Sequence, residues 1–469
     1  MPDEHGTYDS PEAQEAGLER ILSILADLGA DKVYTKRLAP NDNSKNQPYF
    51  GFHLTDLSFL PSGDLVASAT ASQKTKDAKR QIKYQAPLTL TWFDVEGQTY
   101  DAPHAKLIYY PQYPEVRFSG FIRASRVDAS EWMDPYRQGR AEGRWLVLGV
   151  HPNGTIYAYL AIPDSNLARE LENTELIDIG SVLSEIAIDY TLAGQSTEEA
   201  LKTKLLEIHS MGWIPGQKMN ADMTTSPYRA QNGGGYTLEA MLDVPPNGYA
   251  EPDYLGWEVK QFGISRFPRT GAKPTTLMTP EPDGGFYKDQ GAADFVRQYG
   301  YPDKSGIPDR INIGGKHVFG QRIAGTGLTL NILGFDPGEG SITDASGAIA
   351  LLDDADTIAA SWSFAKMMDH WKRKHSQAVY IPCLRRNGNG GGYEYQYGKD
   401  IELGTGTNFE MILSAMASSN VYYDPGIKLE NASTDSPNLK RRSQFRVNHR
   451  HLDSLYNQFE FVNLTTTPP

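Results

Sequence analysis

The sequence predicts two domains of different fold class: a small mainly-β barrel in the first half of the chain and an α/β domain in the second half. The barrel is indicated by short β-type runs at close spacing, separated by Pro, Asn and Gly residues at 61–63 and 152–154. The α/β domain is indicated by a helical segment at 236–242 that precedes a strand at 257–260. A helical stretch between the two halves marks the boundary.

The elements of the first half follow in order. A helix predicted over 11–28 begins with the cap Ser10 and with Pro11 in its first turn, and it ends at Gly29. Its apolar stripe consists of Leu18, Ile21, Leu22, Leu25 and Leu28. The predicted strands of the barrel are 32–38, 49–54, 64–70, 88–93, 105–110, 116–122, 144–150 and 155–161.

Residues 164–200 then become helical, and Ser196 with Glu199 forms a capping box at the last of these helices. We therefore expect three parts in the chain. They are a β domain over 1–165, a helical linker over 166–204 and an α/β domain over 205–469.

Length and composition are those of a globular protein with two or three domains, since 39% of the 469 residues are hydrophobic and 22% are charged. The single cysteine, Cys383, excludes an internal disulfide framework and a cysteine-based zinc site, and it suits a reducing cytoplasm. No apolar run reaches membrane-spanning length, and the N-terminus is not a secretory signal. The net charge of −13 argues against a protein that coats DNA, but a local basic patch can still bind it.

The segment Pro252–Lys260, with the sequence PDYLGWEVK, brings together two acids and a lysine. Successive side chains of a strand alternate, so Glu258 and Lys260 share one face while Trp257 points to an apolar core. Asp253 can bend back to bring its carboxylate beside Glu258. Two carboxylates and an ammonium can hold a Mg²⁺ and a water beside a phosphodiester. The alternative is an amphipathic strand with Glu258 and Lys260 as a weak surface pair.

The segments on both sides strengthen the catalytic hypothesis. Upstream, glycines lead into a short helix with Thr237 as its cap and with an apolar stripe of Leu238, Met241 and Leu242. Glu239 falls off this stripe and can face a site. Downstream, three cations suit a phosphate backbone lying across the site: Arg266, Arg269 and Lys273.

Gly212-Trp213, Gly235–Leu242 and Pro252–Lys260, in this order, resemble the catalytic core of MvaI/BcnI-type restriction endonucleases. These belong to the PD-(D/E)xK superfamily and are related to the repair nickase MutH. The resemblance continues through Gln444–Asn448 to Tyr456, so it covers about 205–469. It implies a mixed sheet flanked by helices.

Carried over residue by residue, the resemblance implies that Asp253, Glu258 and the Val259 carbonyl bind Mg²⁺. It further implies that Lys260 orients the attacking water and that Glu239 assists metal binding.

The function implied is that of a type II restriction endonuclease, acting as a monomer in defence against phage DNA. It would hydrolyse double-stranded DNA at a short GC-rich site of the CC-N-GG kind and leave 5′-phosphate ends. Three alternatives stay open: an enzyme that requires methylated or phosphorothioated DNA, a MutH-like repair nickase, and a non-catalytic DNA-binding protein. Binding of two DNA sites, one as effector and one as substrate, also stays open.

Two basic stretches are further candidates for DNA contacts. The first, 366–386, carries one acid, Asp369, and its helical part at 366–375 is equally consistent with a solvated face. The second, 440–450, has no acid. Its arginines can fork onto guanine edges, and the candidates are Lys440, Arg441, Arg442 and Arg446. His449 and His451 lack a third metal ligand and are expected at the surface or against nucleic acid.

Within the predicted barrel, Tyr34–Asn43 resembles the DNA-binding arm of B3-like domains such as the effector domain of EcoRII. The resemblance implies DNA contacts from one loop, by Lys36, Arg37, Asn41 and Asn43. A second segment, Tyr109–Phe121, surrounds Arg117 with aromatic residues and prolines. It forms either a DNA recognition pocket or ordinary packing with Arg117 paired to Glu115. A B3-like domain joined to such a nuclease resembles the arrangement in UbaLAI.

Overall fold

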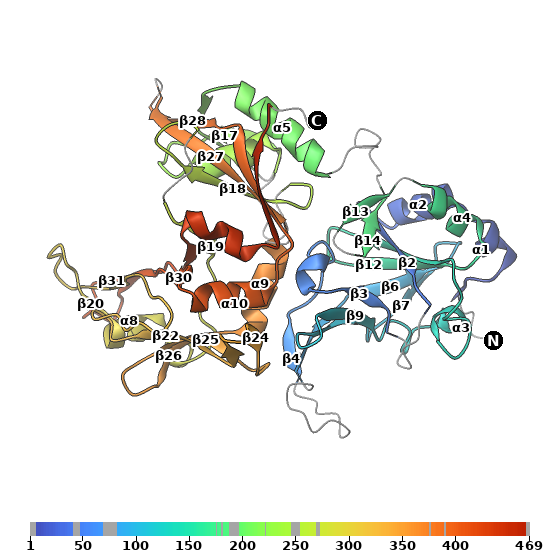
Figure 1. Ribbon diagram of the computed structural model, residues 1–469, viewed down its shortest axis with the longest axis horizontal. Helices are drawn as coiled ribbons and strands as arrows, with labels where there is room; N and C mark the ends of the chain where they lie inside the picture. The colour runs from blue at the N-terminus through green and yellow to red at the C-terminus, as the bar shows by residue number, and fades with distance from the viewer. Residues whose placement is uncertain are drawn as a thin grey trace. The chain divides into compact units, whose positions relative to one another are not determined.

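The computed structural model describes residues 6–40, 47–68, 82–174, 176–179, 182–186, 197–220, 222–244, 254–268, 273–374, 377–388 and 391–465. The chain forms two compact units, which Figure 1 shows. The first unit holds the described residues of Met1–Thr70 and Lys83–Ala200, and the second holds Ile82 and the described residues from Leu201 onward. None of the helices in the described ranges is long and apolar enough to cross a membrane.

The first unit is mainly β and contains two large sheets. The seven-stranded sheet has the order β13 (Ile177–Ile179), β14 (Leu183–Glu185), β2 (Lys32–Leu38), β11 (Arg144–Val150), β12 (Ile156–Ala161), β6 (Leu90–Phe93) and β7 (Thr99–Asp101). The five-stranded sheet has the order β3 (Tyr49–Gly51), β9 (Glu115–Ser119), β8 (Lys106–Tyr110), β5 (Lys83–Pro87) and β4 (Val66–Ser68). A short parallel pair joins β1 (Gly6–Thr7) to β10 (Val127–Asp128).

The two large sheets do not close into the expected barrel within the described part of the chain. Their outer strands β13, β7, β3 and β4 have only three residues each, and no described ladder joins one sheet to the other. Strands this short offer few backbone groups for a further partner. The mainly-β class is confirmed, whereas a closed barrel is not observed.

Helices α1 (Pro11–Glu15), α2 (Leu18–Asp27) and α4 (Asn166–Asn173) lie on one side of the seven-stranded sheet (Figure 1). Ser10 caps α1 as predicted, because its hydroxyl accepts a hydrogen bond from the Ala13 amide at 3.1 Å. The single helix predicted over 11–28 is wrong, because the chain is extended at Gly17. There the Glu170 carboxylate accepts from the Leu18 amide and starts α2 as a separate helix.

The segment 166–204, predicted as a helical linker, contains α4, β13, β14 and the start of α5 (Thr197–Ser210). β14 pairs with β2 through Ser184 and Thr35, so this segment adds two strands to the first unit's sheet. Three-residue strands leave too short an alternation of apolar and polar residues for a sequence pattern to reveal. The smaller helical elements of this unit are η1 (Leu54–Leu57) and α3 (Ser130–Met133).

The second unit is α/β, as predicted. Its main sheet has the order β15 (Ile214–Pro215), β28 (Tyr393–Tyr397), β27 (Gln377–Asn387), β29 (Asp400–Thr405) and β34 (Gln458–Asn463), and β18 (Glu258–Gly263) pairs in parallel with β27. Figure 1 shows α5 beside β27 and β18. Next to this sheet in the chain are β16 (Gln217–Met219), β17 (Thr225–Pro227) and α6 (Gly234–Met241).

Smaller sheets complete the unit. They are β19 (Thr275–Met278), β33 (Phe445–Val447) and β30 (Val421–Tyr423); β20 (Tyr301–Pro302), β21 (Arg310–Gly314), β31 (Gly426–Glu430) and β32 (Asn438–Lys440); β22 (Thr329–Leu333), β25 (Ala348–Leu352) and β26 (Ile358–Ser363); and β23 (Phe335–Asp336) with β24 (Ser341–Ile342). The helices are α7 (Phe286–Gln290), α8 (Ala292–Tyr299), α9 (Phe364–Lys374), α10 (Phe409–Ala417) and η3 (His449–Leu455). The helix predicted at 366–375 corresponds to α9.

Helix α6 begins earlier than predicted. Thr237 is not its cap but lies inside it, where its hydroxyl donates to the Gly233 carbonyl at 2.8 Å. Two tyrosines of β28 hold the first turn: the Tyr395 hydroxyl accepts from the Gly233 amide at 3.0 Å, and the Tyr397 hydroxyl donates to the Gly234 carbonyl at 2.7 Å. These bonds offset the low helix propensity of the glycines.

A continuous apolar core lies between the main sheet and the helices α5 and α6. From the helices it takes Leu201, Leu205, Ile208, Leu238 and Leu242, and from the strands and the turn before β18 it takes Trp257, Val259, Val379, Ile381, Cys383 and Leu403. Burial of each such side chain contributes about 1.5–3 kcal/mol to stability. This core fixes which face of β18 points away from the helices.

Cys383 is the only cysteine of the chain and lies in this core, so it reports on the integrity of the second unit. Burial raises the pKa of its thiol to about 12. At pH 8 we expect native protein to react with a disulfide reagent roughly 10³-fold more slowly than urea-unfolded protein, because the thiolate is the reactive form. Timed labelling with and without urea measures this ratio. Equal rates would place Cys383 at the surface and contradict the described core.

Candidate active site

Strand β18 places Glu258 and Lys260 on the same face, as the alternation of side chains predicts. The Lys260 Nζ lies 2.5 Å from the Glu258 Oε1. The side chain of Glu258 is only 2% exposed and that of Lys260 is 19% exposed. A buried ion pair of this kind costs desolvation energy that an exposed pair does not. The alternative of a weak surface pair therefore does not describe this site.

The neighbours of the pair follow from the register of the sheet. Lys260 lies opposite Tyr380 on β27, Tyr380 opposite Glu402 on β29, and Glu402 opposite Phe461 on β34. Directly paired residues project from the same side of a sheet. One row of side chains therefore runs from Lys260 across four strands to Phe461, which is 73% exposed.

Two tyrosines next to Glu258 form a buried hydrogen-bonded pair. The hydroxyls of Tyr380 and Tyr456 lie 2.8 Å apart. Burial raises the pKa of both tyrosines, and the negative charge of Glu258 raises each further. Both hydroxyls therefore stay neutral at physiological pH. They lie near Glu258 without adding charge.

The second carboxylate oxygen of Glu258, Oε2, is buried and has no hydrogen-bond partner among the described residues. Leaving a charged oxygen buried without a donor is costly, so such an atom indicates a missing ligand. Oxygen is the ligand that Mg²⁺ prefers, and a cation here would satisfy Oε2. The described residues contain no cluster of three or more His, Cys, Asp or Glu able to hold a metal. Asp253, the predicted second ligand, lies outside the described residues.

The chain reverses direction immediately before β18. Tyr254 and Trp257 exchange two backbone hydrogen bonds, of 3.0 and 2.8 Å. Between them Leu255 and Gly256 have φ values of 48° and 83°, which is the conformation of a tight two-residue turn. A leucine in this conformation costs roughly 1–2 kcal/mol. The turn fixes the direction from which the chain enters the strand that carries Glu258.

Val259 and the helix that carries Glu239 lie on the core side of β18. Val259 is buried against α6 and pairs with Val379. Glu239 is half-buried on α6, which packs against β18, and its charge adds to the burial that raises the pKa of Tyr397. Glu258 and Lys260 thus contact each other directly, whereas Glu239 is positioned by the packing of its helix α6 against β18.

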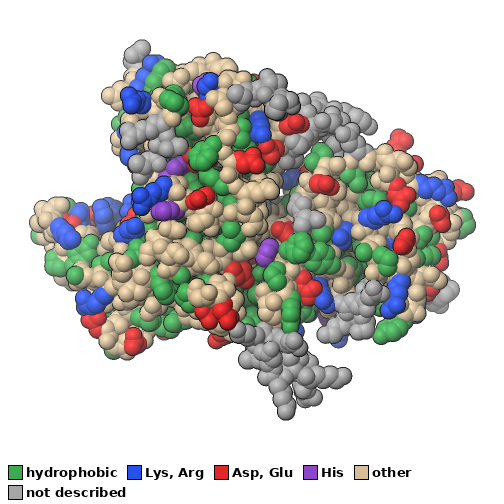
Figure 2. Space-filling model, in the orientation of Figure 1, with side chains coloured by type: hydrophobic (Ala, Val, Ile, Leu, Met, Phe, Trp, Pro, Cys, Tyr) green, Lys and Arg blue, Asp and Glu red, His purple; other side chains and the backbone are tan. Residues whose placement is uncertain are grey.

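The cations predicted downstream of the motif lie on connecting segments. Arg266 is exposed in the turn that follows β18, and Lys273 is exposed just before β19. Arg269 lies outside the described residues. Figure 2 shows Lys and Arg side chains together with His side chains on the visible face of the second unit, around β19.

Two cations of the basic stretch at the C-terminal end are paired with acids from other segments. Lys440 is paired with Glu430 at 3.0 Å, and Arg446 is paired with Asp424 at 2.8 Å. Arg446 also donates to the Pro274 carbonyl at 2.9 Å, so this side chain joins three segments of the fold.

Arg441 and Arg442 are exposed. Arg441 also hydrogen-bonds to Tyr287. These two arginines are therefore better placed than Arg446 to reach a ligand.

In the first unit the predicted loop begins as a strand. Lys36 and Arg37 lie on β2, which pairs with β11 along its whole length. Burial lowers the pKa of Lys36 to about 8, and its Nζ donates to the Val182 carbonyl at 3.4 Å. Arg37 is exposed and pairs with Glu172 at 3.2 Å. Asn41 and Asn43 lie outside the described residues.

Arg117 is paired with Glu115 at 2.8 Å, as the packing alternative predicts. The guanidinium also lies over the ring of Tyr110, 5.6 Å from its centroid. Both residues are nevertheless only partly buried, so the pair borders a cavity rather than filling the core.

The sequence did not reveal a buried histidine–glutamate pair on the Lys260 side of the sheet. The His449 Nε2 lies 3.0 Å from Glu402, its Nδ1 lies 3.2 Å from the Thr275 hydroxyl, and its ring centroid is 4.0 Å from that of Phe262. The expectation that His449 lies at the surface is wrong, because η3 turns it inward beneath Glu402. The only sequence signal was an acid in the middle of the apolar strand 400–405.

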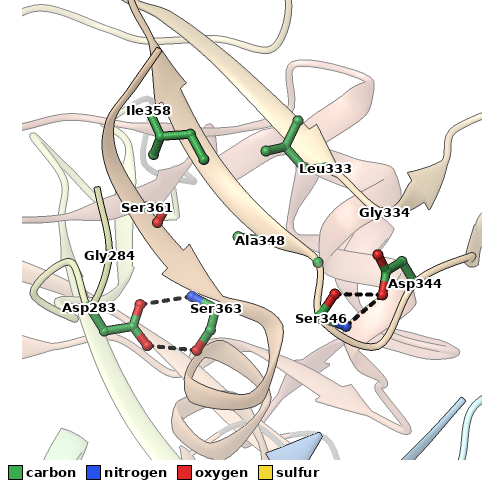
Figure 3. A pocket seen from close by; sticks show the side chains of 11 residues that line it. Asp283, Gly284, Leu333, Gly334, Asp344, Ser346, Ala348, Ile358, Ser361 and Ser363 are labelled. Atoms are coloured by element: carbon green, nitrogen blue, oxygen red, sulfur yellow. Dashed lines mark hydrogen bonds between the residues drawn. The ribbon is translucent and has the colours of Figure 1, made fainter. Parts of the chain in front are cut away.

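A separate cavity of about 410 Å³ lies beside β25 and β26 (Figure 3). Asp283 accepts hydrogen bonds from the Ser363 amide and hydroxyl, at 2.9 and 2.6 Å. Asp344 accepts from the Ser346 amide and hydroxyl, at 2.8 and 2.7 Å. These carboxylates already have donors, and their negative charge does not suit a phosphate backbone. The cavity is therefore no candidate for the DNA-binding site.

The comparisons with known proteins point to one family. Residues 202–456 match the model of the MvaI/BcnI restriction endonuclease family. A solved complex of the restriction endonuclease MvaI with cognate DNA is similar at 15% identity and a TM-score of 0.42, covering 59% of this chain and 99% of that one. MvaI without DNA is similar at 14% identity and a TM-score of 0.33, with the same coverage of both chains. No curated protein matches the chain.

The buried ion pair predicts a strong coupling between its two members. We expect Lys260→Met to lower the free energy of unfolding of the second unit by about 3 kcal/mol, because Glu258 is left buried and unpaired. Adding Glu258→Gln should recover at least about 1 kcal/mol of this loss, because the uncompensated charge is then removed. Urea unfolding in EDTA, followed by labelling of Cys383, gives both values. Simple addition of the two single effects would show that the pair is not coupled.

Proposed function

The chain belongs to the MvaI/BcnI restriction endonuclease family, and we propose that it is a sequence-specific type II restriction endonuclease that hydrolyses DNA with Mg²⁺. The observation that carries this proposal is the buried pair of Glu258 and Lys260 on β18, with Glu258 Oε2 lacking a partner among the described residues. The family resemblance further suggests a short GC-rich target of the CC-N-GG kind.

The residues present fit a Mg²⁺ ion. Glu258 Oε2, the carboxylate of Asp253 and the Val259 carbonyl would hold it, and Glu239 would assist from α6. In the sequence Asp253 immediately precedes Tyr254, which pairs with Trp257 across the turn that leads into β18. When bound, the ion supplies Lewis-acid stabilisation of the negative charge that develops on the scissile phosphate.

Lys260 supplies the second part of the chemistry. Its ammonium is held by Glu258 at 2.5 Å while 19% of the side chain remains exposed, so it is fixed and still accessible. From this position it orients the attacking water and donates to the phosphate oxygens as charge develops on them. The nearby hydroxyls of Tyr380 and Tyr456 are neutral, so they add no charge beside the Lys260 ammonium.

The first unit is the proposed effector or specificity module, similar to a B3-like domain. Its candidate contacts are Lys36, Arg37 and Arg117, together with Asn41 and Asn43. The second unit contributes Arg266, Arg269, Lys273, Arg441 and Arg442 as contacts to phosphates and bases. Lys440 and Arg446 are further candidates: Lys440 forms an exposed pair with Glu430, whereas Arg446 is bound to Asp424 and to the Pro274 carbonyl.

The catalytic assignment predicts a separation of cutting from binding. Lys260→Ala should reduce Mg²⁺-dependent cleavage of DNA by at least about 10²-fold, because the ammonium that orients the water is removed. Binding to the same DNA in Ca²⁺ should change little. The assays are digestion of modified and unmodified phage DNA, with sequencing of the ends, and a gel-shift measurement.

Lys202→Ala, on α5 at the other face of the sheet, is the matched control and should cut normally. Retained cutting by Lys260→Ala would remove Lys260 from the site. Digestion of modified DNA only would favour the modification-dependent alternative. If the native protein cleaves no DNA, the alternative of a non-catalytic DNA-binding protein is favoured.

The exposed Arg441 and the paired Arg446 are expected to differ in what their substitution changes. Arg441→Ala should weaken DNA binding and reduce the dependence of log K on log salt concentration by about 0.9, the value for one lost phosphate contact. Arg446→Ala should instead lower the thermal stability of the second unit, because Asp424 and the Pro274 carbonyl lose their partner. Salt titrations and thermal unfolding of both variants test this. Equal effects of both substitutions on binding alone would contradict it.

A further inference from the structure

A cavity of about 250 Å³ opens in the first unit between β2 of one sheet and β3 and β9 of the other. Its size suits one small planar group rather than a large ligand. The lining combines apolar and polar side chains. Leu38, Pro40, Pro48 and Met133 supply apolar surface, and Lys36, Gln47, Tyr49, Glu115, Arg117 and Arg144 supply polar groups.

Two polar atoms of this lining are buried without a hydrogen-bond partner among the described residues. They are the Tyr49 hydroxyl and the Gln47 Oε1. The other end of the Gln47 amide is held in place, because its Nε2 donates to the Ser119 hydroxyl at 3.0 Å. Each unsatisfied atom costs roughly 1–3 kcal/mol, which a bound ligand with matching groups would recover.

A third polar group can donate into the cavity. Lys36 is partly buried, and its hydrogen bond to the Val182 carbonyl is long at 3.4 Å. Its pKa of about 8 still leaves it protonated at neutral pH. The remaining charged groups are already satisfied: Arg117 is bound to Glu115, and Arg144 donates to three backbone carbonyls.

This set of groups does not suit an anion. The Gln47 Oε1 and the carboxylate of Glu115 are acceptors and would face any phosphate or carboxylate unfavourably. When the Tyr49 hydroxyl donates, it and the Lys36 ammonium supply two donors and Gln47 Oε1 supplies one acceptor, which together complement a neutral group with one donor and two acceptors. The base-pairing edges of cytosine and thymine carry that combination. Adenine offers one acceptor fewer, and guanine offers two donors and one acceptor.

We propose that this cavity of the first unit binds a single pyrimidine base turned out of the DNA stack. The prolines and Met133 would contact the ring, while Gln47, Tyr49 and Lys36 would read its base-pairing edge. The inference rests on the proposed function only for its partner, DNA, and it involves no group of the cleavage site. It gives the first unit a way to read a base that does not depend on a basic surface.

Saturation-transfer NMR of the full chain in EDTA, with the four deoxynucleosides as separate probes, tests the proposal. Deoxycytidine or thymidine should give a signal at least about fivefold stronger than deoxyadenosine and deoxyguanosine. Tyr49→Phe and Lys36→Met should each reduce that signal at least about threefold. Tyr136→Phe, at a tyrosine of the same unit that is 77% exposed, is the matched control and should not change it.

Equal signals for all four nucleosides, or a pyrimidine signal that survives both Tyr49→Phe and Lys36→Met, would overturn the proposal. Circular dichroism of each variant shows whether it has folded, and Gln47→Leu replaces any variant that has not. Cleavage of DNA is measured separately with Mg²⁺. Nucleoside binding without cleavage would count against the nuclease alone, and cleavage without nucleoside binding would count against the pocket alone.

Discussion

The second unit depends on one strand that must satisfy opposite requirements on its two faces. Strand β18 presents Val259 to an apolar core, next to the buried Trp257 that precedes it, and holds Glu258 and Lys260 on the other side. A slip of one residue in its pairing with β27 would push the acid and the lysine into that core. The tight turn at Leu255 and Gly256 and the parallel register with β27 therefore fix the site as much as the charged residues themselves.

The parts of the site that the sequence predicts are those set by local periodicity. Alternation along β18 was sufficient to place Glu258 and Lys260 on one face, and the bounds predicted for the strands at 32–38 and 144–150 are those of β2 and β11. The pairing of His449 with Glu402 could not be predicted in this way, because the two residues come from η3 and β29. They meet because β34, the strand that follows η3, pairs with β29. Pairing between strands that are far apart in the sequence also explains why the sequence predicted a closed barrel that the described residues do not form. It explains equally why β13 and β14, within the segment 166–204, were not predicted.

The charge patterns of the sequence did not identify which cations are available to bind DNA. The run from Lys440 to Arg450 contains no acid, yet two of its cations are paired with acids from other strands, Glu430 and Asp424. A run of one sign in a sequence therefore does not establish an available basic surface, because the fold supplies partners that the run does not show. Arg441 and Arg442 are exposed, and a sequence pattern cannot distinguish them from the paired Arg446.

A net charge of −13 is compatible with DNA recognition if the specific contacts do not depend on a broad basic surface. Electrostatic attraction to phosphates carries little sequence information, and its strength falls steeply with salt concentration. A small cavity lined by Gln47, Tyr49 and Lys36 would gain its energy from hydrogen bonds that a mismatched base leaves unmade, which is a larger penalty inside a cavity than in water. An acidic chain thereby has lower affinity for nonspecific DNA but still discriminates between bases. This combination suits an enzyme that must cut DNA only at its own target sites.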